Sequence, residues 1–251
     1  MTKEQSIQRS DLTVVEKAAV LMEALPYVRK FRGSTFVVKY GGSCLEHPDL
    51  KVGSRVAGDV TFLNSVGIRV VVVHGGGKAI SRELAKRNLE PVFVDGLRVT
   101  DAETLTVVRD TLDGEVNPGL CERIESRHGL PEGLSGADAL RCIPMPGRDD
   151  LGYVGQIVGV EIDPINAALD AGRVPVISCL ASGQDGQIYN TNADTAAAKV
   201  AVALEARRLV YLSDVPGLLR NPEEPDTLIS TLPVGEVASL KESGVISKGM
   251  R

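Results

Sequence analysis

The sequence predicts an α/β protein whose central sheet is mainly parallel and is covered by helices on both faces. Two apolar, β-branched segments, residues 35–40 and 68–74, each lead directly into a glycine cluster and then into a helical segment. Uninterrupted apolar strands that alternate with helices are typical of parallel sheets, because helices bury both faces of each strand. The alternation continues along the chain and therefore predicts a layered α/β fold.

Hydrophobic periodicity and glycine or proline breaks predict the individual elements. The expected helices span residues 12–31, 48–66, 78–88, 102–112, 163–171, 194–204 and 233–242. The expected strands span residues 35–40, 68–74, 139–143, 153–162, 174–180 and 208–214. Residues 153–162 contain glycine breaks and are expected to form a hairpin at the sheet edge, and Pro26 is expected to kink or end the first helix. A soft boundary between two lobes is expected near residues 182–190.

The composition excludes several classes of protein. The net charge of −5 argues against an extended surface for nucleic acid. No apolar run approaches the roughly 20 residues that a membrane span requires, and the polar N-terminus lacks the apolar stretch of a signal peptide. The four cysteines and three histidines are scattered, so no metal site is expected. These features are typical of a cytoplasmic protein with reduced thiols.

Two glycine clusters, at residues 41–42 and 75–77, follow the first two strands. The N–H groups of such turns and of the following helix N-terminus point at one spot and favour an anion there. In open α/β sheets, ligands lie outside the carboxyl ends of the strands, which is where both clusters fall. We therefore expect a phosphate or carboxylate ligand; the alternative is that the clusters are only tight connections. Neither cluster has the spacing of a dinucleotide-binding motif or a P-loop.

Four polar residues near these turns are candidates for contacts with such a ligand. Lys39 lies inside an apolar strand and is costly to bury unless it meets an anion, although an edge lysine could instead extend to water. Arg98 is expected in a loop beside the sheet, where it could bind a carboxylate or form a surface ion pair. Asp194 precedes a helix and could simply cap it. Asp214 ends a strand and could contact a nucleotide or belong to an ordinary turn.

Six short segments occur in an order that is specific as a set. They are residues 37–42 (VVKYGG), 74–77 (HGGG), 96–101 (GLRVTD), 151–155 (LGYVG), 190–194 (NTNAD) and 212–217 (LSDVPG). The set resembles the N-acetylglutamate kinases of the amino acid kinase family. The segment GLRVTD favours them over aspartokinases and uridylate kinases, which share the fold.

The resemblance implies a three-layer αβα sandwich with a mainly parallel central sheet, the amino-acid-kinase or carbamate-kinase-like fold. It implies a tail and amphipathic helix at residues 1–34, an N-acetylglutamate-binding lobe at 35–182 and a partial ATP-binding lobe at 183–251. The implied reaction is ATP-dependent phosphorylation of the side-chain carboxylate of N-acetyl-L-glutamate, the second step of arginine biosynthesis, with Mg²⁺ bound together with the nucleotide. Other substrates, aminoadipate or aspartate, stay open, as does a catalytically silent module that senses arginine or N-acetylglutamate.

The resemblance also implies roles for individual residues, carried over by position. Lys39 is the lysine that stabilises the phosphoryl group in transfer, and Asp194 orients it. The implied substrate-binding residues are Gly42, Gly76, Gly77, Arg98 and Asn190. The implied nucleotide-binding residues are Asp214, Val215, Gly217, Leu218, Leu219 and Ser247.

The chain departs from the family pattern at its end. In the family, a pair like Gly249 and Met250 is soon followed by a second catalytic lysine, whereas this sequence stops at Arg251. We therefore expect a shortened form of a longer enzyme, and full turnover by the 251-residue chain would refute this. The first helix resembles the extra helix of arginine-inhibited, hexameric members. It predicts arginine as a feedback inhibitor and a homodimer or homohexamer.

Overall fold

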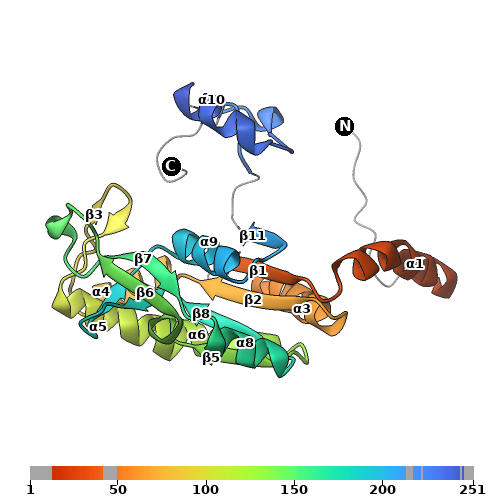
Figure 1. The fold of residues 1–251 in the computed structure, drawn as a ribbon, viewed down its shortest axis with the longest axis horizontal. Coiled ribbons are helices and arrows are strands. Elements are labelled where there is room, and N and C mark those ends of the chain that lie inside the picture. Colours follow the sequence, from red (N-terminus) through yellow and green to blue (C-terminus); the bar gives the residue numbers. More distant parts are fainter. Residues whose placement is uncertain (1–12, 42–49, 213–216, 222, 244, 246–251) are drawn as a thin grey trace.

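The computed structural model describes residues 13–41, 50–212, 217–221, 223–243 and 245, and its centre is a five-stranded sheet (Figure 1). The strand order is β11-β1-β2-β8-β5, and every neighbouring pair is parallel. In that order the strands span Arg208–Leu212, Thr35–Tyr40, Arg69–His74, Val174–Ser178 and Pro131–Leu134. The prediction of a parallel central sheet is confirmed.

Helices cover both faces of this sheet. Because side chains alternate along a strand, Val37 and Val73 pack on one face, against α8 and α9, whereas Val38 and Val72 pack on the other, against α3 and α6. These helices span Asp163–Asp170 (α8), Ala193–Ala203 (α9), Leu50–Ser65 (α3) and Asn117–Glu125 (α6). The arrangement is the three-layer αβα sandwich that was expected.

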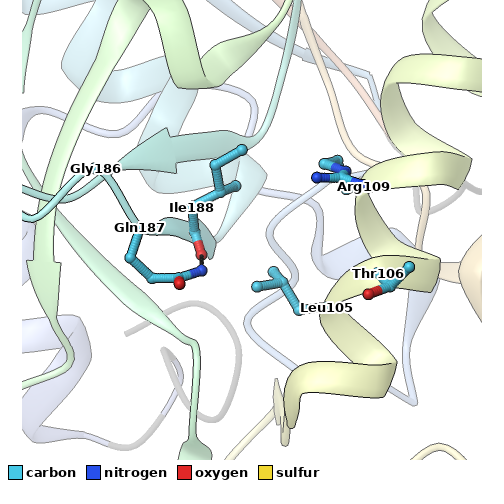
Figure 2. A pocket seen from close by; sticks show the side chains of 6 residues that line it. All are labelled: Leu105, Thr106, Arg109, Gly186, Gln187 and Ile188. Atoms are coloured by element: carbon cyan, nitrogen blue, oxygen red, sulfur yellow. Dashed lines mark hydrogen bonds between the residues drawn. The ribbon is translucent and has the colours of Figure 1, made fainter.

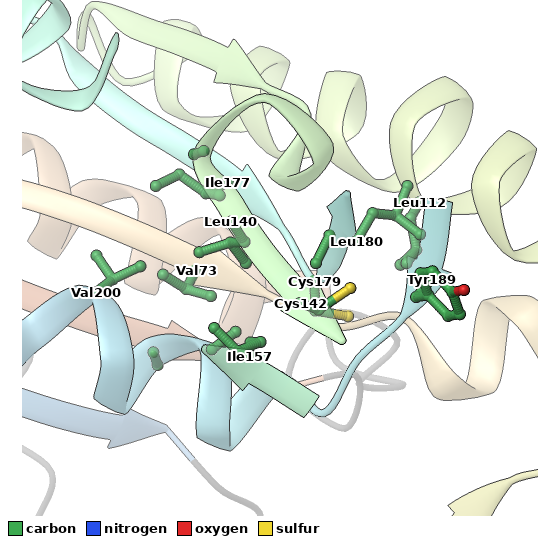
Figure 3. Packing of buried hydrophobic residues seen from close by; sticks show 14 of the residues in the cluster. Val73, Leu112, Leu140, Cys142, Ile157, Ile177, Cys179, Leu180, Tyr189 and Val200 are labelled. Atoms are coloured by element: carbon green, nitrogen blue, oxygen red, sulfur yellow. The ribbon is translucent and has the colours of Figure 1, made fainter. Parts of the chain in front are cut away.

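The core on the α9 face contains two of the cysteines. Figure 3 shows Cys142 and Cys179 within the cluster that also holds Val73 and Val200. Burial raises the pKa of the Cys179 thiol to about 12 and that of the Cys142 thiol to about 11. Both side chains are therefore neutral thiols that serve packing at physiological pH.

A second sheet has four strands in the order β10-β9-β6-β7. In that order they span Ile188–Asn190, Leu180–Ser182, Leu140–Pro144 and Gly155–Val160. The expected hairpin at the edge of the central sheet is wrong, because β7 is a single strand that pairs antiparallel with β6 in this second sheet. The glycine at 155 does not make a turn: a Cβ there would lie 2.9 Å from the Cys142 Sγ and from the Tyr189 Cβ, so it permits close packing.

A short antiparallel hairpin carries Arg98, which was expected in a loop. Its strands are β3 (Phe93–Val94) and β4 (Leu97–Arg98). The two turn residues, Asp95 and Gly96, have φ angles of 51° and 81°. Positive φ at both central residues is the requirement of a tight hairpin turn, and Asp-Gly is one of the sequences that meets it. Arg98 is therefore held by a strand pair.

The first helix, α1 (Val14–Phe31), touches the core at its C-terminal end, where the ring centroids of Phe31 and Phe36 lie 5.3 Å apart. A capping box fixes its start: Glu16 N–H donates to the Thr13 hydroxyl, and Thr13 N–H donates to the Glu16 carboxylate. The helix continues through Pro26, so the proline does not end it. None of its residues is buried, and Figure 1 shows it extending away from the sheet.

The structure describes four further α-helices. They span Gly77–Lys86 (α4), Ala102–Thr111 (α5), Gly136–Ala139 (α7) and Val237–Glu242 (α10). A five-residue π-helix, Leu112–Val116, joins α5 directly to α6. Neither α6 nor β5 was expected, and the strand expected to run on to residue 214 is described only as far as Leu212. No helix in the described ranges is long and apolar enough to cross a membrane.

Candidate functional site

The glycine turn after β2 lies at the carboxyl edge of the central sheet. β1 and β2 run in register, with Tyr40 opposite His74, so the two strands end side by side. The Gly75 N–H donates to the Tyr40 carbonyl oxygen at 3.4 Å and ties the two strand ends together. The glycine turn after β1 was expected to supply a donor from Gly42, but that residue lies outside the described residues.

Gly76 forms the bend between β2 and α4. A Cβ at this position would lie 2.8 Å from Leu112 Cδ2 and 3.3 Å from Val116 Cγ2, so any larger residue requires Leu112 to shift. The Gly76 carbonyl accepts the first bond of the helix, from Ile80 N–H. The N–H groups of Gly76 and Gly77 have no acceptor within the part of the chain that the structure describes. They are therefore available to an anion at the helix N-terminus.

Gly77, one residue further, offers a matched comparison for this packing. We expect Gly76→Ala to lower the free energy of unfolding by about 1 to 3 kcal/mol, because its Cβ must displace Leu112. Gly77→Ala meets no atom within 4 Å and should leave stability unchanged or raise it by up to about 1 kcal/mol. Urea unfolding of both variants measures the difference, and equal stabilities would contradict the packing described.

Lys39 and Asp194 form an ion pair beside this turn. The Lys39 Nζ lies 2.9 Å from Asp194 Oδ1. The lysine side chain is only 18% exposed, whereas the aspartate side chain is 53% exposed. The aspartate therefore supplies the negative charge that a lysine in an apolar strand requires, and it lies at the solvent-exposed side of the pair.

Asp194 is not the cap of its helix. The N-cap of α9 is Asn192, whose side-chain oxygen accepts from Thr195 N–H at 2.9 Å. The aspartate in the first turn is thereby free to reach Lys39. A Cβ built on Gly75 would lie 3.2 Å from the Ala193 Cβ, so the start of α9 abuts the glycine turn. The structure thus brings together Lys39, Asp194 and the turn at residues 75–77.

Tyr211 adds a contact that the sequence analysis missed. It lies on β11 directly opposite Lys39, and its hydroxyl donates to the Asp194 carbonyl oxygen at 3.3 Å. Partial burial, and then the charge of Asp194, raise the pKa of the phenol. The hydroxyl therefore stays protonated and helps to hold the start of α9 against β11.

Arg98 contacts the first turn of α4, directly after the glycine turn at residues 75–77. Its Nη2 donates to the Gly77 carbonyl oxygen and to the Ser81 Oγ, both at 2.9 Å. The guanidinium stacks over the Phe93 ring at 4.6 Å from the centroid. Its Nη1 is buried without a hydrogen-bond partner among the described residues, and burial lowers the pKa of the group. A buried guanidinium with unused N–H groups fits a carboxylate ligand.

Asn190 is connected to Arg98 through one threonine. The Asn190 amide donates to the Thr100 hydroxyl at 3.2 Å, and that hydroxyl donates to the Arg98 carbonyl oxygen at 2.9 Å. Asn190 also stands four residues before Asp194 on the segment that enters α9. The predicted substrate-binding residues Gly76, Gly77, Arg98 and Asn190 therefore surround one end of the sheet, next to the Lys39–Asp194 pair.

Of the expected nucleotide-binding residues, the three that the structure describes are not brought to this site. Gly217, Leu218 and Leu219 belong to a segment that Figure 1 shows apart from the sheet that carries Lys39. Within that segment, Leu218 and Leu219 pair with the chain near Leu228. Asp214, Val215 and Ser247 lie outside the described residues.

A separate cavity of about 250 Å³ opens between α5 and the strand β10 (Figure 2). Its lining residues are Leu105, Thr106, Arg109, Gly186, Gln187 and Ile188. None of the predicted site residues lines it. Within the described ranges, no group of three or more histidine, cysteine, aspartate or glutamate side chains could hold a metal ion.

Comparison with known proteins points to one family. The family model described as "Amino acid kinase family" matches residues 34–251. The acetylglutamate kinase of Thermosynechococcus vestitus is 46% identical, over 94% of this chain and 79% of its own length. That of Brachyspira hyodysenteriae is 42% identical, over 94% of this chain and 82% of its own length.

Solved structures include a similar domain in a longer protein. N-acetylglutamate synthase from Neisseria gonorrhoeae, in complex with coenzyme A and N-acetylglutamate, is similar with a TM-score of 0.76 and 32% identity. The match covers 90% of this chain but only 51% of the synthase chain. The same architecture thus occurs both in kinases and as part of a synthase.

Proposed function

Because the chain belongs to the amino acid kinase family, we propose that it transfers the γ-phosphoryl group of ATP to the side-chain carboxylate of N-acetyl-L-glutamate. This reaction is the second step of arginine biosynthesis. The observation that carries the proposal is the Lys39–Asp194 ion pair beside the unused N–H groups of Gly76 and Gly77. The choice of substrate follows the relatives named acetylglutamate kinase, which match 94% of the chain.

The chemistry asks for positioning and charge neutralisation more than for proton transfer. The carboxylate nucleophile is already ionised at pH 7, so no general base is required. Lys39 neutralises charge on the phosphoryl group, and Asp194 keeps the lysine at that position. The N–H groups of Gly76 and Gly77 add fixed donors at the same spot.

Substrate recognition is assigned to the hairpin side of the site. The free Nη1 of Arg98 suits the α-carboxylate of N-acetylglutamate, since guanidinium and carboxylate form paired, charge-assisted hydrogen bonds. Asn190 has an amide that suits the polar amide end of the substrate. The product is an acyl phosphate.

The nucleotide side of the proposal rests on the family. Kinases of this family use ATP, and Mg²⁺ supplies charge neutralisation on its phosphates. The Lys39 ammonium fits phosphate oxygens. The assignment of residues 214–219 and Ser247 to the nucleotide stays a prediction, as do the lobe boundaries and the cytoplasmic location.

We further propose that α1 joins copies of the protein and takes part in inhibition by arginine. None of its side chains is buried, and burial of its exposed apolar residues against a second copy would stabilise the assembly. These residues are Val14, Val15, Val20, Leu21, Met22 and Tyr27. A sedimentation experiment that finds only dimers, together with an activity assay that finds no inhibition by arginine, would contradict this role of α1.

A silent sensing module is the main alternative, because the synthase contains a domain of the same fold. The ion pair between Lys39 and Asp194 argues against it, since a module that only binds ligands has no need of a phosphoryl-stabilising lysine. Related kinases that act on aminoadipate or aspartate are the other alternative.

The test measures ADP formation by the gene product with ATP, Mg²⁺ and each candidate substrate. N-acetyl-L-glutamate should stimulate ADP release far more than glutamate, aspartate or aminoadipate does. Hydroxylamine should trap the acyl phosphate as a hydroxamate, which ties the ADP to carboxylate phosphorylation. ADP formation that N-acetylglutamate does not stimulate would overturn the proposed substrate, and binding without any ADP would favour the sensing module.

A further inference from the structure

A buried histidine stands directly before the glycine turn and has no role in the proposed chemistry. His74 ends β2, and its side chain is 0% exposed. The alternation of β2 places it on the face packed by α3 and α6, with Val72, and therefore opposite Val73 and Lys39. Its Nε2 lies 3.1 Å from Asn117 Nδ2, and its Nδ1 lies 3.1 Å from the Gly75 carbonyl oxygen.

The orientation of the Asn117 amide follows from its other contacts. The Nδ2 lies 2.8 Å from the Val176 carbonyl oxygen and 3.4 Å from the Leu134 carbonyl oxygen. A carbonyl can only accept, so the amide group that faces both must be the NH₂. The Asn117 oxygen points instead toward the Cys121 thiol, at 3.7 Å. The amide has two N–H donors for three acceptors, and because the contact to Leu134 is the longest, one N–H points to Val176 and the other to His74.

The protonation of His74 follows in turn. Because Asn117 donates, the His74 Nε2 must accept and carries no proton. The proton of the neutral ring then sits on Nδ1, where it donates to the Gly75 carbonyl oxygen. Burial lowers the pKa of the ring to about 4, with Asp113 the charged group that acts in the opposite direction, so the ring stays neutral at physiological pH.

This contact fixes the direction of the next N–H group. In a trans peptide, the carbonyl of one residue and the N–H of the next point in opposite directions. The peptide between Gly75 and Gly76 is trans, like every peptide bond that the structure describes. When His74 holds the Gly75 carbonyl on the α6 side, the Gly76 N–H points away, toward the face that carries Lys39.

We propose that His74 and Asn117 are positioning residues that aim the Gly76 N–H at the anionic group of the substrate. This inference rests on the proposed function, because it deepens the role of the same site. His74 touches no substrate; it acts through the Gly75–Gly76 peptide, and Asn117 acts through His74.

Two neighbouring features provide the space that Asn117 needs. A Cβ on Gly133 of β5 would lie 2.5 Å from the Asn117 Oδ1, so the strand passes the amide only because this residue is glycine. The π-helix directly before Asn117 changes the helical register and turns the start of α6 inward, where Asn117 is 6% exposed. Single π turns inside helices are frequent at functional sites.

Two replacements of His74 separate positioning from packing. The amide nitrogen of asparagine reaches the position of Nδ1, whereas that of glutamine reaches the position of Nε2. We expect His74→Asn to keep the dissociation constant for N-acetylglutamate within about 3-fold, because the bond to the Gly75 carbonyl is retained. We expect His74→Gln to raise this dissociation constant about 10-fold to 100-fold, because the Gly76 N–H no longer points at the charged group of the substrate.

The exposed His128 has a positive φ of 64° that asparagine tolerates, so His128→Asn is the matched control and should bind like the unmodified protein. Titration calorimetry measures all three variants. If His74→Gln binds as tightly as His74→Asn, or if the asparagine variant is the weaker, the inference is overturned.

The unmodified protein gives a readout that needs no variant. The ¹⁵N spectrum of the histidine side chains should contain a ring with a protonated Nδ1 and an unprotonated Nε2, and correlation with its own backbone amide assigns this ring to His74. A proton on Nε2 in that ring would overturn the inference even if neither variant folds. The spectrum does not depend on which substrate binds, so failure of N-acetylglutamate to bind the unmodified protein would count against the proposed function alone.

Discussion

Replacing Lys39 with methionine is expected to lower kcat for ADP formation by about 100-fold to 1000-fold. The lysine is the one cation held beside the glycine turn by an ion pair to Asp194, in the described part of the chain, and such donors act where charge develops in the transition state. Methionine keeps the apolar stem and removes only the charge. The KM for N-acetylglutamate should change much less, because Arg98 holds the α-carboxylate of the substrate. Steady-state kinetics of the gene product measure both constants.

Lys199 provides the control for this change. It lies on the same helix as Asp194 but is exposed to solvent, so Lys199→Met removes a charge without touching the site. Its kcat should match that of the unmodified protein. A Lys39→Met protein that turns over at a comparable rate would show that the ion pair is structural.

Replacing Arg98 with methionine is expected to raise the dissociation constant for N-acetylglutamate about 10-fold to 100-fold. Arg98 is 7% exposed, and its Nη1 is buried without a partner among the described residues. A hydrogen bond between charged groups contributes about 1.5 to 3 kcal/mol. Titration calorimetry measures the constant.

Arg109→Met tests the same loss of charge elsewhere. Arg109 lines the separate cavity of Figure 2, so its replacement should leave the affinity unchanged. If this variant loses affinity and Arg98→Met does not, the substrate binds in the cavity beside α5 and the site described above is wrong.

Much of the sheet could be predicted because its central strands carry a strong local signal. Residues 35–40 form β1 with the expected bounds, since five of the six residues favour a strand and a glycine follows the last. The missed elements carry weak signals. β5 contains both proline and glycine, which is tolerated because it lies at the sheet edge. The start of α6 reads Asn-Pro-Gly and looks like a turn, but the preceding π-helix and the cover it provides for the sheet override that preference.

The Arg98 hairpin could have been found from the sequence. Asp95 and Gly96 stand between the apolar pair Phe93-Val94 and Leu97, and an Asp-Gly between such residues is a recognised signal for a two-residue turn. The resemblance to kinases drew attention to the residue itself, but its burial depends on the Phe93 ring and on α4, which no local pattern reveals.

The site could be predicted only in its parts. The glycine turns and the buried lysine indicate an anion from local sequence alone. Glycine clusters expose backbone N–H groups, and a lysine inside an apolar strand requires a negative partner. The pairing of Lys39 with Asp194 depends on how α9 crosses β1, which is a property of the tertiary fold. The contact of His74 with Asn117 depends on the π-helix before α6 and on Gly133 in β5, so no single segment of the sequence predicts it.

The central claim is that the side-chain carboxylate of N-acetylglutamate meets the glycine turn at the end of β2. Titrating ¹⁵N-labelled protein with N-acetylglutamate tests it most directly, because each backbone amide reports separately. The account predicts that the largest shifts occur at the amides of Gly76 and Gly77, with little change at Gly186 and Gln187 beside the other cavity. Shifts confined to Gly186 and Gln187, with Gly76 and Gly77 unmoved at saturation, would contradict it.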